Sequence, residues 1–305
     1  MAMAKRIFLF LLVNFLVIIT LTAVLSLFNV KPYLSAHGIN YASLMIFCLV
    51  WGMGGAFISL ALSKIMAKWM MGVQIIDPDK ARSDEKALID LVHDLCRQAH
   101  FTYMPEVGIY NSSEPNAFAT GPSQKRSLIA VSSGLLQRMS SKELEGVLSH
   151  EIAHIQNGDM VTMALIQGVV NAFVMFLARI LAFACSSLGK SKDDNSSIGS
   201  YLSYNLFVIL FEIVFMVLGS LVVCWFSRYR EFRADLGGAH IAGKQKMIAA
   251  LEALQRMQGV QDPSTAKPSF NSLKISSVKK LGWTRFFSSH PPLELRIQRL
   301  QESIM

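Results

Sequence analysis

The stretch His150-Glu151-Ile152-Ala153-His154 determines how the rest of the chain is interpreted. On a helix, His150 and His154 lie one turn apart on the same face, so their imidazoles can bind a single Zn²⁺ ion. Glu151 stands beside the first histidine, where a carboxylate can act as general base on a zinc-bound water. The pattern is typical of the core of a zinc peptidase site.

The residues on either side predict a well-delimited helix. Ser140 and Glu143 form the S-x-x-E pattern of a capping box, and Gly158 suits the C-terminal cap. Apolar residues recur between them at helical spacing: Leu144, Val147, Leu148 and Ile152. A surface helix that carries two histidines by chance is the alternative that the motif alone leaves open.

A mononuclear catalytic zinc needs a third protein ligand from elsewhere in the chain. We expect this ligand to be Glu231, because Asp235 follows it by four residues and would face the same way on a helix. Asp235 could then accept a hydrogen bond from a ligating imidazole. The alternative is a solvated charged helix face that includes Arg228, Arg230 and Arg233.

The composition is that of a membrane protein. Hydrophobic residues make up 52% of the chain, charged residues make up 16%, and the mean hydropathy is +0.39. A transmembrane helix needs about 20 apolar residues. Four stretches are long enough: 7–28, 42–63, about 161–188 and about 200–226. The first is too long for the apolar core of a signal peptide and is followed by no clear cleavage site, which argues against a secretory signal.

The basic residues predict an orientation in the membrane. Lys5 and Arg6 precede the first stretch, and four more basic residues follow the second: Lys64, Lys68, Lys80 and Arg82. Only Lys31 lies in the loop that connects the two stretches. The positive-inside rule therefore places both termini and residues 64–159 in the cytoplasm. The third and fourth stretches form a hairpin that returns Glu231 to the side of the two histidines.

We expect an α+β membrane protein, mainly α, in which four hydrophobic helices accompany a cytoplasmic zincin-like metalloprotease domain with a small β-sheet. Periodicity predicts helices at 83–100 and 227–258 and a last helix from Pro291, with strands at 107–110, 116–120 and 127–132. Residues 259–280 are polar and turn-rich. The expected divisions are 1–65 and 160–226 as transmembrane pairs, and 66–159 and 227–305 as the two parts of the protease domain.

Several separated segments resemble the bacterial HtpX membrane proteases, relatives of the Ste24-type CAAX-processing enzymes. These segments are 145–159 around the two histidines, 227–235 around Glu231, Ser289-His290-Pro291-Pro292-Leu293 and Asn116–Gly121. The resemblance runs along essentially the whole chain; it departs at Arg233, where some relatives have histidine. It implies one zinc ion on His150, His154 and Glu231, with Glu151 catalytic.

The resemblance also implies a location and partners. It implies a multi-pass protein of the bacterial inner membrane that acts in quality control under stress. Its substrates would be unfolded membrane proteins, and other quality-control proteases are possible partners besides the lipid bilayer.

Two further segments have a functional and an ordinary interpretation. Asn116, Ala117, Phe118 and Ala119 can form an edge strand that pairs with substrate backbone, or an ordinary surface strand. His290 can donate to the oxyanion of the tetrahedral intermediate, or serve as a turn residue before two prolines. With the resemblance, we expect the functional role for both segments.

Other classes of function fit less well. The net charge of +8 suggests nucleic acid, but much of it lies beside the hydrophobic stretches, where anionic lipids attract it, so we expect no nucleic-acid partner. Three of the four cysteines lie in apolar runs and no CxxC occurs, so neither disulfides nor a cysteine zinc site is expected. A site-2-type protease would carry HExxH within a span, whereas here the motif precedes the third stretch. A non-enzymatic membrane scaffold or transporter would hold zinc in a structural site closed by four protein ligands, with no need of Glu151.

Polar residues within the third and fourth stretches form a last group. We expect Arg179 to extend toward the far membrane interface, because its long side chain can do so. We expect Glu212 to hydrogen-bond Asn171 or to face a cavity, because a lone charge at membrane depth is costly.

Overall fold

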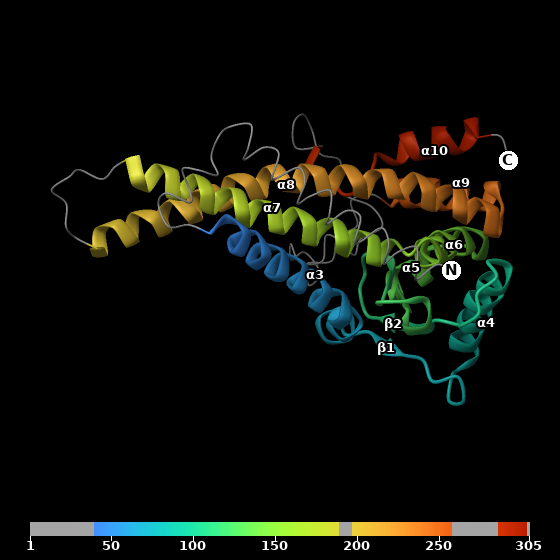
Figure 1. Ribbon diagram of the computed structural model, residues 1–305. Helices are drawn as coiled ribbons and strands as arrows, with labels where there is room; N and C mark the ends of the chain where they lie inside the picture. Colours follow the sequence, from blue (N-terminus) through green and yellow to red (C-terminus); the bar gives the residue numbers. More distant parts are fainter. Residues whose placement is uncertain (1–39, 189–196, 258–285, 304–305) are drawn as a thin grey trace. The chain divides into compact units, whose positions relative to one another are not determined.

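The computed structural model describes residues 40–188, 197–257 and 286–303. The expected first span at 7–28 and the turn-rich segment 259–280 lie outside these residues. Contacts divide the chain into two units, Met1–Ile58 with Ala164–Val223, and Ser59–Met163 with Cys224–Met305. The described chain is mainly helical with one small sheet (Figure 1).

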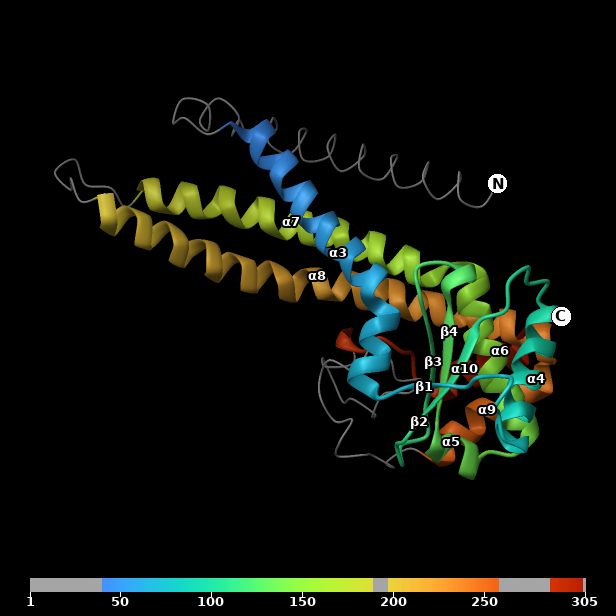
Figure 2. The ribbon, with the colours of Figure 1, turned by 90° about the horizontal axis from the view of Figure 1, so that it is seen from below.

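Three described helices are long and apolar enough to cross a membrane. They are α3 (Tyr41–Met71), α7 (Asp159–Leu188) and α8 (Ser197–Ala242), and they contain the second, third and fourth expected stretches. In the first unit, α7 and α8 run side by side (Figures 1 and 2). The backbones of α3 and α7 approach closely, because a Cβ at Gly52 would lie 2.6 Å from the backbone nitrogen of Ala172.

A charged pair joins α7 to α8 within the first unit. Arg179 Nη1 donates to Glu212 Oε1 at 2.8 Å, and the guanidinium lies 5.8 Å from the centre of the Phe47 ring of α3. The predicted hydrogen bond between Glu212 and Asn171 is wrong, because Asn171 Oδ1 instead accepts from Gln167 Nε2 at 2.8 Å. Arg179 therefore pairs inside the helix bundle, where an unpaired charge would be costly, and does not simply extend to an interface.

The second unit contains a four-stranded mixed sheet. Its strands are β1 (Gln74–Ile75), β2 (Glu106–Tyr110), β3 (Ala117–Thr120) and β4 (Leu128–Ser132), in the order β1-β2-β4-β3. β2 and β4 are parallel, and the other two pairs are antiparallel. The three predicted strands are confirmed; the two-residue β1 is too short to leave a periodic pattern. β3 lies at one edge of the sheet.

Strand β4 is buried on both faces of the sheet. Along β4, Leu128 and Ala130 pack in a cluster with Ala67 of α3, whereas Ile129 and Val131 pack in the main core. That core also takes residues from α4 (Ser83–Gln98), α6 (Ser141–Asn157), α9 (Lys244–Arg256) and α10 (Leu293–Glu302). A short helix, α5 (Ser133–Arg138), follows β4.

The HExxH helix, α6, begins and ends as its sequence predicts. The backbone N–H of Ser140 donates to the Glu143 carboxylate at 2.8 Å in a capping box. Gly158 adopts φ +69°, a left-handed conformation that costs glycine little, and closes the helix. The prediction of a single helix over 227–258 is wrong in one respect, because the helix is interrupted at Gly243, between α8 and α9.

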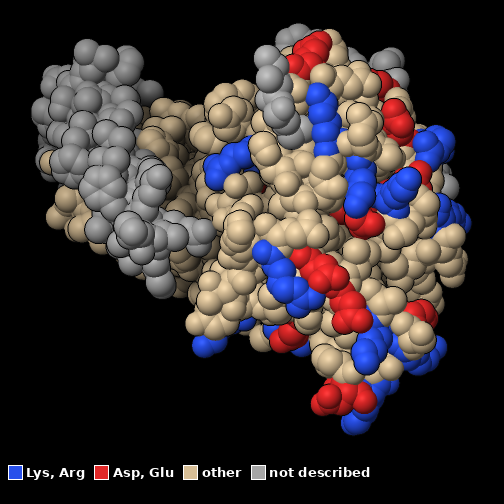
Figure 3. All heavy atoms as spheres, turned by 90° about the vertical axis from the view of Figure 1, so that its right-hand side faces the viewer, with Lys and Arg blue, Asp and Glu red and all other residues tan. Residues whose placement is uncertain are grey.

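Charges on the soluble surface are mixed in sign. The face drawn in Figure 3 carries Lys and Arg side chains interspersed with Asp and Glu side chains. Two of the ion pairs, Lys246–Glu145 and Arg256–Glu143, join α9 to α6. These contacts support the packing of the helix that carries the two histidines.

Candidate metal centre

His150 and His154 meet on the buried face of α6. They are 2% and 6% exposed, and their Nε2 atoms lie 3.1 Å apart. The rings are nearly perpendicular, at 81°. One turn of helix therefore places two imidazole nitrogens where a single ion can contact both. Because α6 ends at Asn157, before the apolar helix α7, the motif does not lie within a span, unlike that of a site-2-type protease.

Glu231 of α8 faces the same two nitrogens. Its carboxylate oxygens lie 3.5 Å from His150 Nε2 and 3.4 Å from His154 Nε2, and the side chain has no exposed surface. Neither carboxylate oxygen accepts a well-aligned hydrogen bond within the described chain, although His290 Nδ1 lies 2.8 Å from Oε2. A buried carboxylate without well-aligned donors is costly, and a divalent cation between it and the imidazoles would satisfy it. The donor set of two imidazoles and one carboxylate fits zinc.

A carboxylate contacts the Nδ1 atom of each histidine. Asp235 Oδ1 lies 3.0 Å from His150 Nδ1, and Asp159 Oδ2 lies 2.6 Å from His154 Nδ1. Both contacts leave the Nε2 atoms facing Glu231, the arrangement in which a carboxylate orients a metal-binding imidazole. Burial alone would lower the pKa of His150, but the neighbouring carboxylates of Asp235 and Glu231 outweigh it and raise the pKa to about 9. A proton and zinc would therefore compete for His150.

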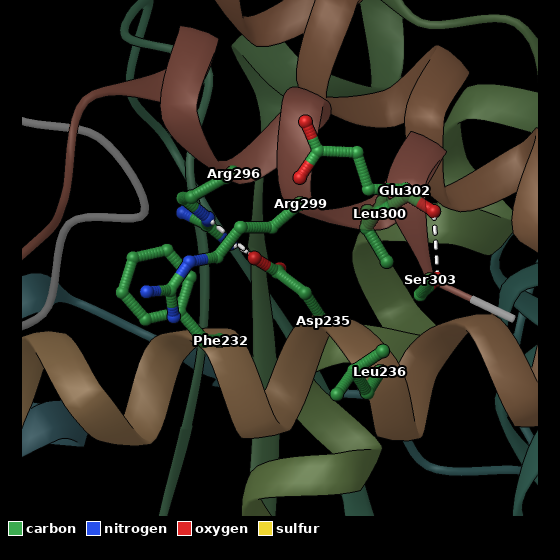
Figure 4. Close-up of a pocket in the computed structure, with 8 residues that line it drawn as sticks. All are labelled: Phe232, Asp235, Leu236, Arg296, Arg299, Leu300, Glu302 and Ser303. Atoms are coloured by element: carbon green, nitrogen blue, oxygen red, sulfur yellow. Dashed lines mark hydrogen bonds and ion pairs between the residues drawn. The ribbon is translucent and has the colours of Figure 1, made fainter.

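Arg296 of α10 completes the buried charge cluster. It has no exposed surface, and it donates to Asp235 from Nε at 2.8 Å and from Nη2 at 2.6 Å (Figure 4). Its Nη1 lies 3.6 Å from Glu231 Oε2. The guanidinium thus balances two carboxylates that would otherwise lie together in the protein interior. A bidentate pair of this kind also restricts the orientation of Asp235.

Glu151 reaches from α6 to the edge strand. The backbone N–H of Ala119 donates to Glu151 Oε2 at 2.9 Å, and Glu151 is 6% exposed. The carboxylate beside the first histidine is therefore held by β3, the strand expected to bind substrate. This contact could not be read from sequence, because it joins a side chain to a main-chain group 32 residues away.

The other expected site residues lie at different distances from this centre. His290 is buried, and its Nδ1 lies 2.8 Å from Glu231 Oε2. Asn116 donates its amide to the Tyr110 hydroxyl at 2.9 Å, and the Phe118 ring packs on Tyr110. The side chains of Asn116 and Phe118 therefore contact Tyr110, whereas Ala117 and Ala119 pack in the main core with α6.

Asp159 and Arg296 are the site residues that sequence reasoning missed. Arg296 gives a signal, since it lies between Leu293 and Leu300 at helical spacing and must therefore face inward with them. An inward arginine predicts a buried carboxylate partner. Asp159 gives a weaker signal, because only the left-handed turn at Gly158 brings it back to His154.

Comparisons with known proteins agree on one family. Residues 82–304 match Peptidase family M48. Over 308 residues the chain is 51% identical to a protein named Protease HtpX homolog from Bacillus subtilis, covering 98% of this chain and 99% of that protein. It is 46% identical over 299 residues to Protease HtpX from Thioalkalivibrio sulfidiphilus, covering 97% and 98% of the two chains.

A solved structure is similar in fold. The crystal structure of S. mikatae Ste24p matches with a TM-score of 0.56 at 18% sequence identity. The match covers 92% of this chain and 64% of that chain, so this chain spans less than two thirds of that protein. At this level of identity the likeness concerns the fold alone.

Proposed function

Because this chain belongs to peptidase family M48, within its HtpX group, we propose that it degrades misfolded or damaged membrane proteins in protein quality control. It is a membrane zinc metalloprotease whose zinc site comprises His150, His154 and Glu231. The observation that supports hydrolysis best is the buried set of three ligand atoms with Glu151 beside it. A structural zinc site would have no need of this additional carboxylate.

The metal would be held by His150 Nε2, His154 Nε2 and the Glu231 carboxylate. Zinc at such a site supplies Lewis-acid chemistry, which acidifies water and polarises a carbonyl. Asp235 and Asp159 would keep the imidazole tautomers in which Nε2 is free to bind. Arg296 would hold Asp235 in place from behind.

Glu151 would move the proton. With Oε2 bound to the Ala119 N–H, the carboxylate has a defined orientation and its other oxygen is available. That oxygen takes a proton from the attacking water and later returns it to the leaving amine. His290, beside Glu231, would donate to the oxyanion of the tetrahedral intermediate.

The free edge of β3 would bind the substrate backbone. Asn116 O accepts from the Ser132 N–H of β4 at 2.9 Å. Because pairing alternates along an antiparallel strand, Phe118 and Thr120 also face β4, and the main-chain groups of Ala117 and Ala119 face outward. The Ala119 N–H is bound to Glu151, so the Ala117 N–H and the two outward carbonyls would pair with the substrate. Strand addition there holds a peptide extended without demanding a sequence, as a quality-control protease requires. Asn116 and Phe118 would support the strand from its other face.

Glu151→Gln is the test of this mechanism. We expect the variant, purified in detergent, to keep one zinc per chain and to lose casein cleavage by about 10²–10⁴-fold. Glu145→Gln is the matched control, because Glu145 lies on the same helix and pairs with Lys246 away from the metal. Full cleavage by Glu151→Gln, or purified wild-type protein without zinc, would contradict the proposal.

The location proposed is the bacterial inner membrane, with both termini and the protease domain in the cytoplasm. The basic residues beside the apolar helices support this orientation. Proposed partners are the bilayer, unfolded membrane proteins and other quality-control proteases. A fluorescent protein that matures only in the cytoplasm, fused after Met305, should fluoresce in whole cells; a dark fusion at normal expression would reverse the orientation.

A further inference from the structure

The surroundings of α8 change at residue 227. From Leu202 to Phe226, its large apolar side chains are mostly exposed, and only 6% of its most apolar window is buried. From Ser227 on, a buried face begins and continues through Glu231, Ala234 and Asp235. The surroundings of the helix therefore change from an exposed apolar surface to the protein interior within one turn. This change marks the level at which the bilayer should end.

Aromatic side chains gather at this level on the outer face of α8. Trp225 and Tyr229 are 57% and 64% exposed, and their rings stack at 6.4 Å. Phe226 packs edge-on against Trp225 at 4.8 Å. Trp and Tyr are enriched where spans meet the head groups, because their rings are apolar and carry a polar tip.

The segment 286–288 is hydrogen-bonded to α8 next to these aromatic residues. Arg228 lies three residues after Trp225 and therefore on the same side of the helix. Its Nη1 donates to Phe286 O and to Ser288 O, both at 2.8 Å. Phe286 and Phe287 are 46% and 40% exposed. In Figure 1 this short red segment lies against α8. We call Trp225, Phe226, Tyr229, Phe286 and Phe287 the aromatic collar.

We propose that the aromatic collar sits in the head-group layer of the bilayer, with Phe286 and Phe287 inserted beside α8 as a membrane contact that does not span. Continuity with the exposed apolar surface of α8 identifies lipid as the occupant. Two consecutive exposed phenylalanines are unfavourable in water and favourable at an acyl boundary.

The contact bears on which peptide bonds can be cut. Glu231 lies six positions after Trp225, which is no more than about 9 Å along a helix. Phe287 precedes His290 by three residues in the chain. The bilayer surface would thus support the segment that leads to His290, and bonds close to the membrane would reach the metal centre most readily.

Photocrosslinking in the full-length protein tests the contact. p-Benzoylphenylalanine, which resembles Phe, replaces Phe287 in protein reconstituted into phosphatidylethanolamine–phosphatidylglycerol vesicles. Irradiation should add the mass of a lipid to the chain. The same residue at Ile213, exposed on α8, is the positive reference. Leu295 on α10, 41% exposed against 40% for Phe287, is the control and should give no lipid adduct.

Other outcomes would overturn the proposal. A lipid yield at Phe287 no higher than at Leu295 would place the segment in water. A crosslink to a second copy, or to another part of the same chain, would show that protein covers the collar. Phe286 is probed in parallel, so that loss of zinc or activity in one variant does not decide the result. Lipid adducts at neither position, in protein that retains zinc, contradict the inference.

Discussion

Arg296 lies behind the metal ligands with no exposed surface and makes two hydrogen bonds to Asp235. Arg296→Met would leave the Asp235 carboxylate buried without its counter-charge, which typically costs about 3–5 kcal/mol. Asp235 would also lose the constraint that aims it at His150, and we expect zinc affinity to fall about 10–100-fold. Competition with a chelator and thermal unfolding measure the two effects.

Arg299 is the matched control for this prediction. It is the next arginine on α10, is exposed, and lies 4.0 Å from the centre of the Phe232 ring (Figure 4). Arg299→Met should cost only about 0.5–1 kcal/mol, the value of an exposed cation–π contact, and should leave zinc affinity unchanged. Equal losses in the two variants would mean that α10 packing, and not the Asp235 pair, is responsible.

His290 offers a second prediction at the scale of one side chain. Its ring lies against Glu231, so His290→Ala should keep zinc and lower kcat by about 10²–10³-fold through loss of one oxyanion donor. His290→Gln keeps a donor and should recover part of the rate. Full turnover by His290→Ala, measured on a casein-type substrate, would exclude this role.

The metal ligands could be predicted from sequence, whereas the charges around them mostly could not. His150, His154 and Glu231 follow from the motif and from the need for a third ligand on the same membrane side. Arg296 and the Ala119–Glu151 contact depend on tertiary packing, which brings α10 and β3 to α6. A pattern within one helix cannot show which distant element covers it.

Among the elements, α6 depends on its N-terminal cap. A hydrogen bond from the Ser140 backbone N–H lowers the pKa of Glu143 below its usual 4.5. Burial opposes this effect, and the Ser140 hydroxyl and Arg256 add to it. A carboxylate with a depressed pKa stabilises the fold above its unfolded pKa and loses this contribution as pH falls through its folded pKa. At pH 7, Glu143→Gln should cost about 0.3–1 kcal/mol, the value of a negative charge at a helix N-terminus.

The pH dependence separates this charge effect from packing. The difference in thermal midpoint between wild type and Glu143→Gln should be present at pH 7 and close as pH falls below about 4.5. A gap that persists unchanged at low pH would show that shape, and not charge, stabilises the cap. Lys142→Gln, at an exposed neighbouring position, controls for a general change of surface charge.

The edge strand β3 carries a further prediction. Ala119→Pro removes the N–H that holds Glu151, so cleavage should fall mainly in kcat while zinc content stays unchanged. Ala117→Pro removes an outward N–H that does not contact Glu151 and should act mainly on KM. Steady-state kinetics with a fluorogenic peptide separates the two. Normal activity in Ala119→Pro would contradict the proposed role of the Glu151 contact, and an unchanged KM in Ala117→Pro would contradict the proposed substrate strand.

The ends of an element could be predicted where specific capping residues mark them in the sequence. The capping box and Gly158 delimit α6 because each satisfies specific backbone groups. The end of α8 was harder, because the helix continues from apolar residues into polar ones without a stop until Gly243. An apolar run shows where lipid contact ends, not where helical hydrogen bonding ends.

At the scale of the whole molecule, hydropathy predicts where the apolar helices lie, but it does not predict which of their polar residues contact each other. The sequence suggests Asn171 or a cavity as the surroundings of Glu212, whereas α7 presents Arg179 to it. Facing residues depend on helix rotation, which the small side chains between α3 and α7 help to set, as at Gly52 and Ala172. When a helix is apolar on all sides, its sequence does not indicate which side faces a neighbouring helix.

The Arg179–Glu212 pair supplies the last prediction. Glu212→Gln leaves the guanidinium without its counter-charge between apolar helices, so the thermal midpoint should fall. The loss should stay below the about 3–5 kcal/mol of a fully buried pair, because the side chains are 22% and 32% exposed. Arg179→Leu with Glu212→Leu removes both charges and should restore the midpoint, since apolar replacement of a buried pair is often neutral or stabilising. Asn171→Leu, which breaks a contact within α7 only, is the control. Unchanged stability and activity in Glu212→Gln would show that the pair does not hold α7 to α8.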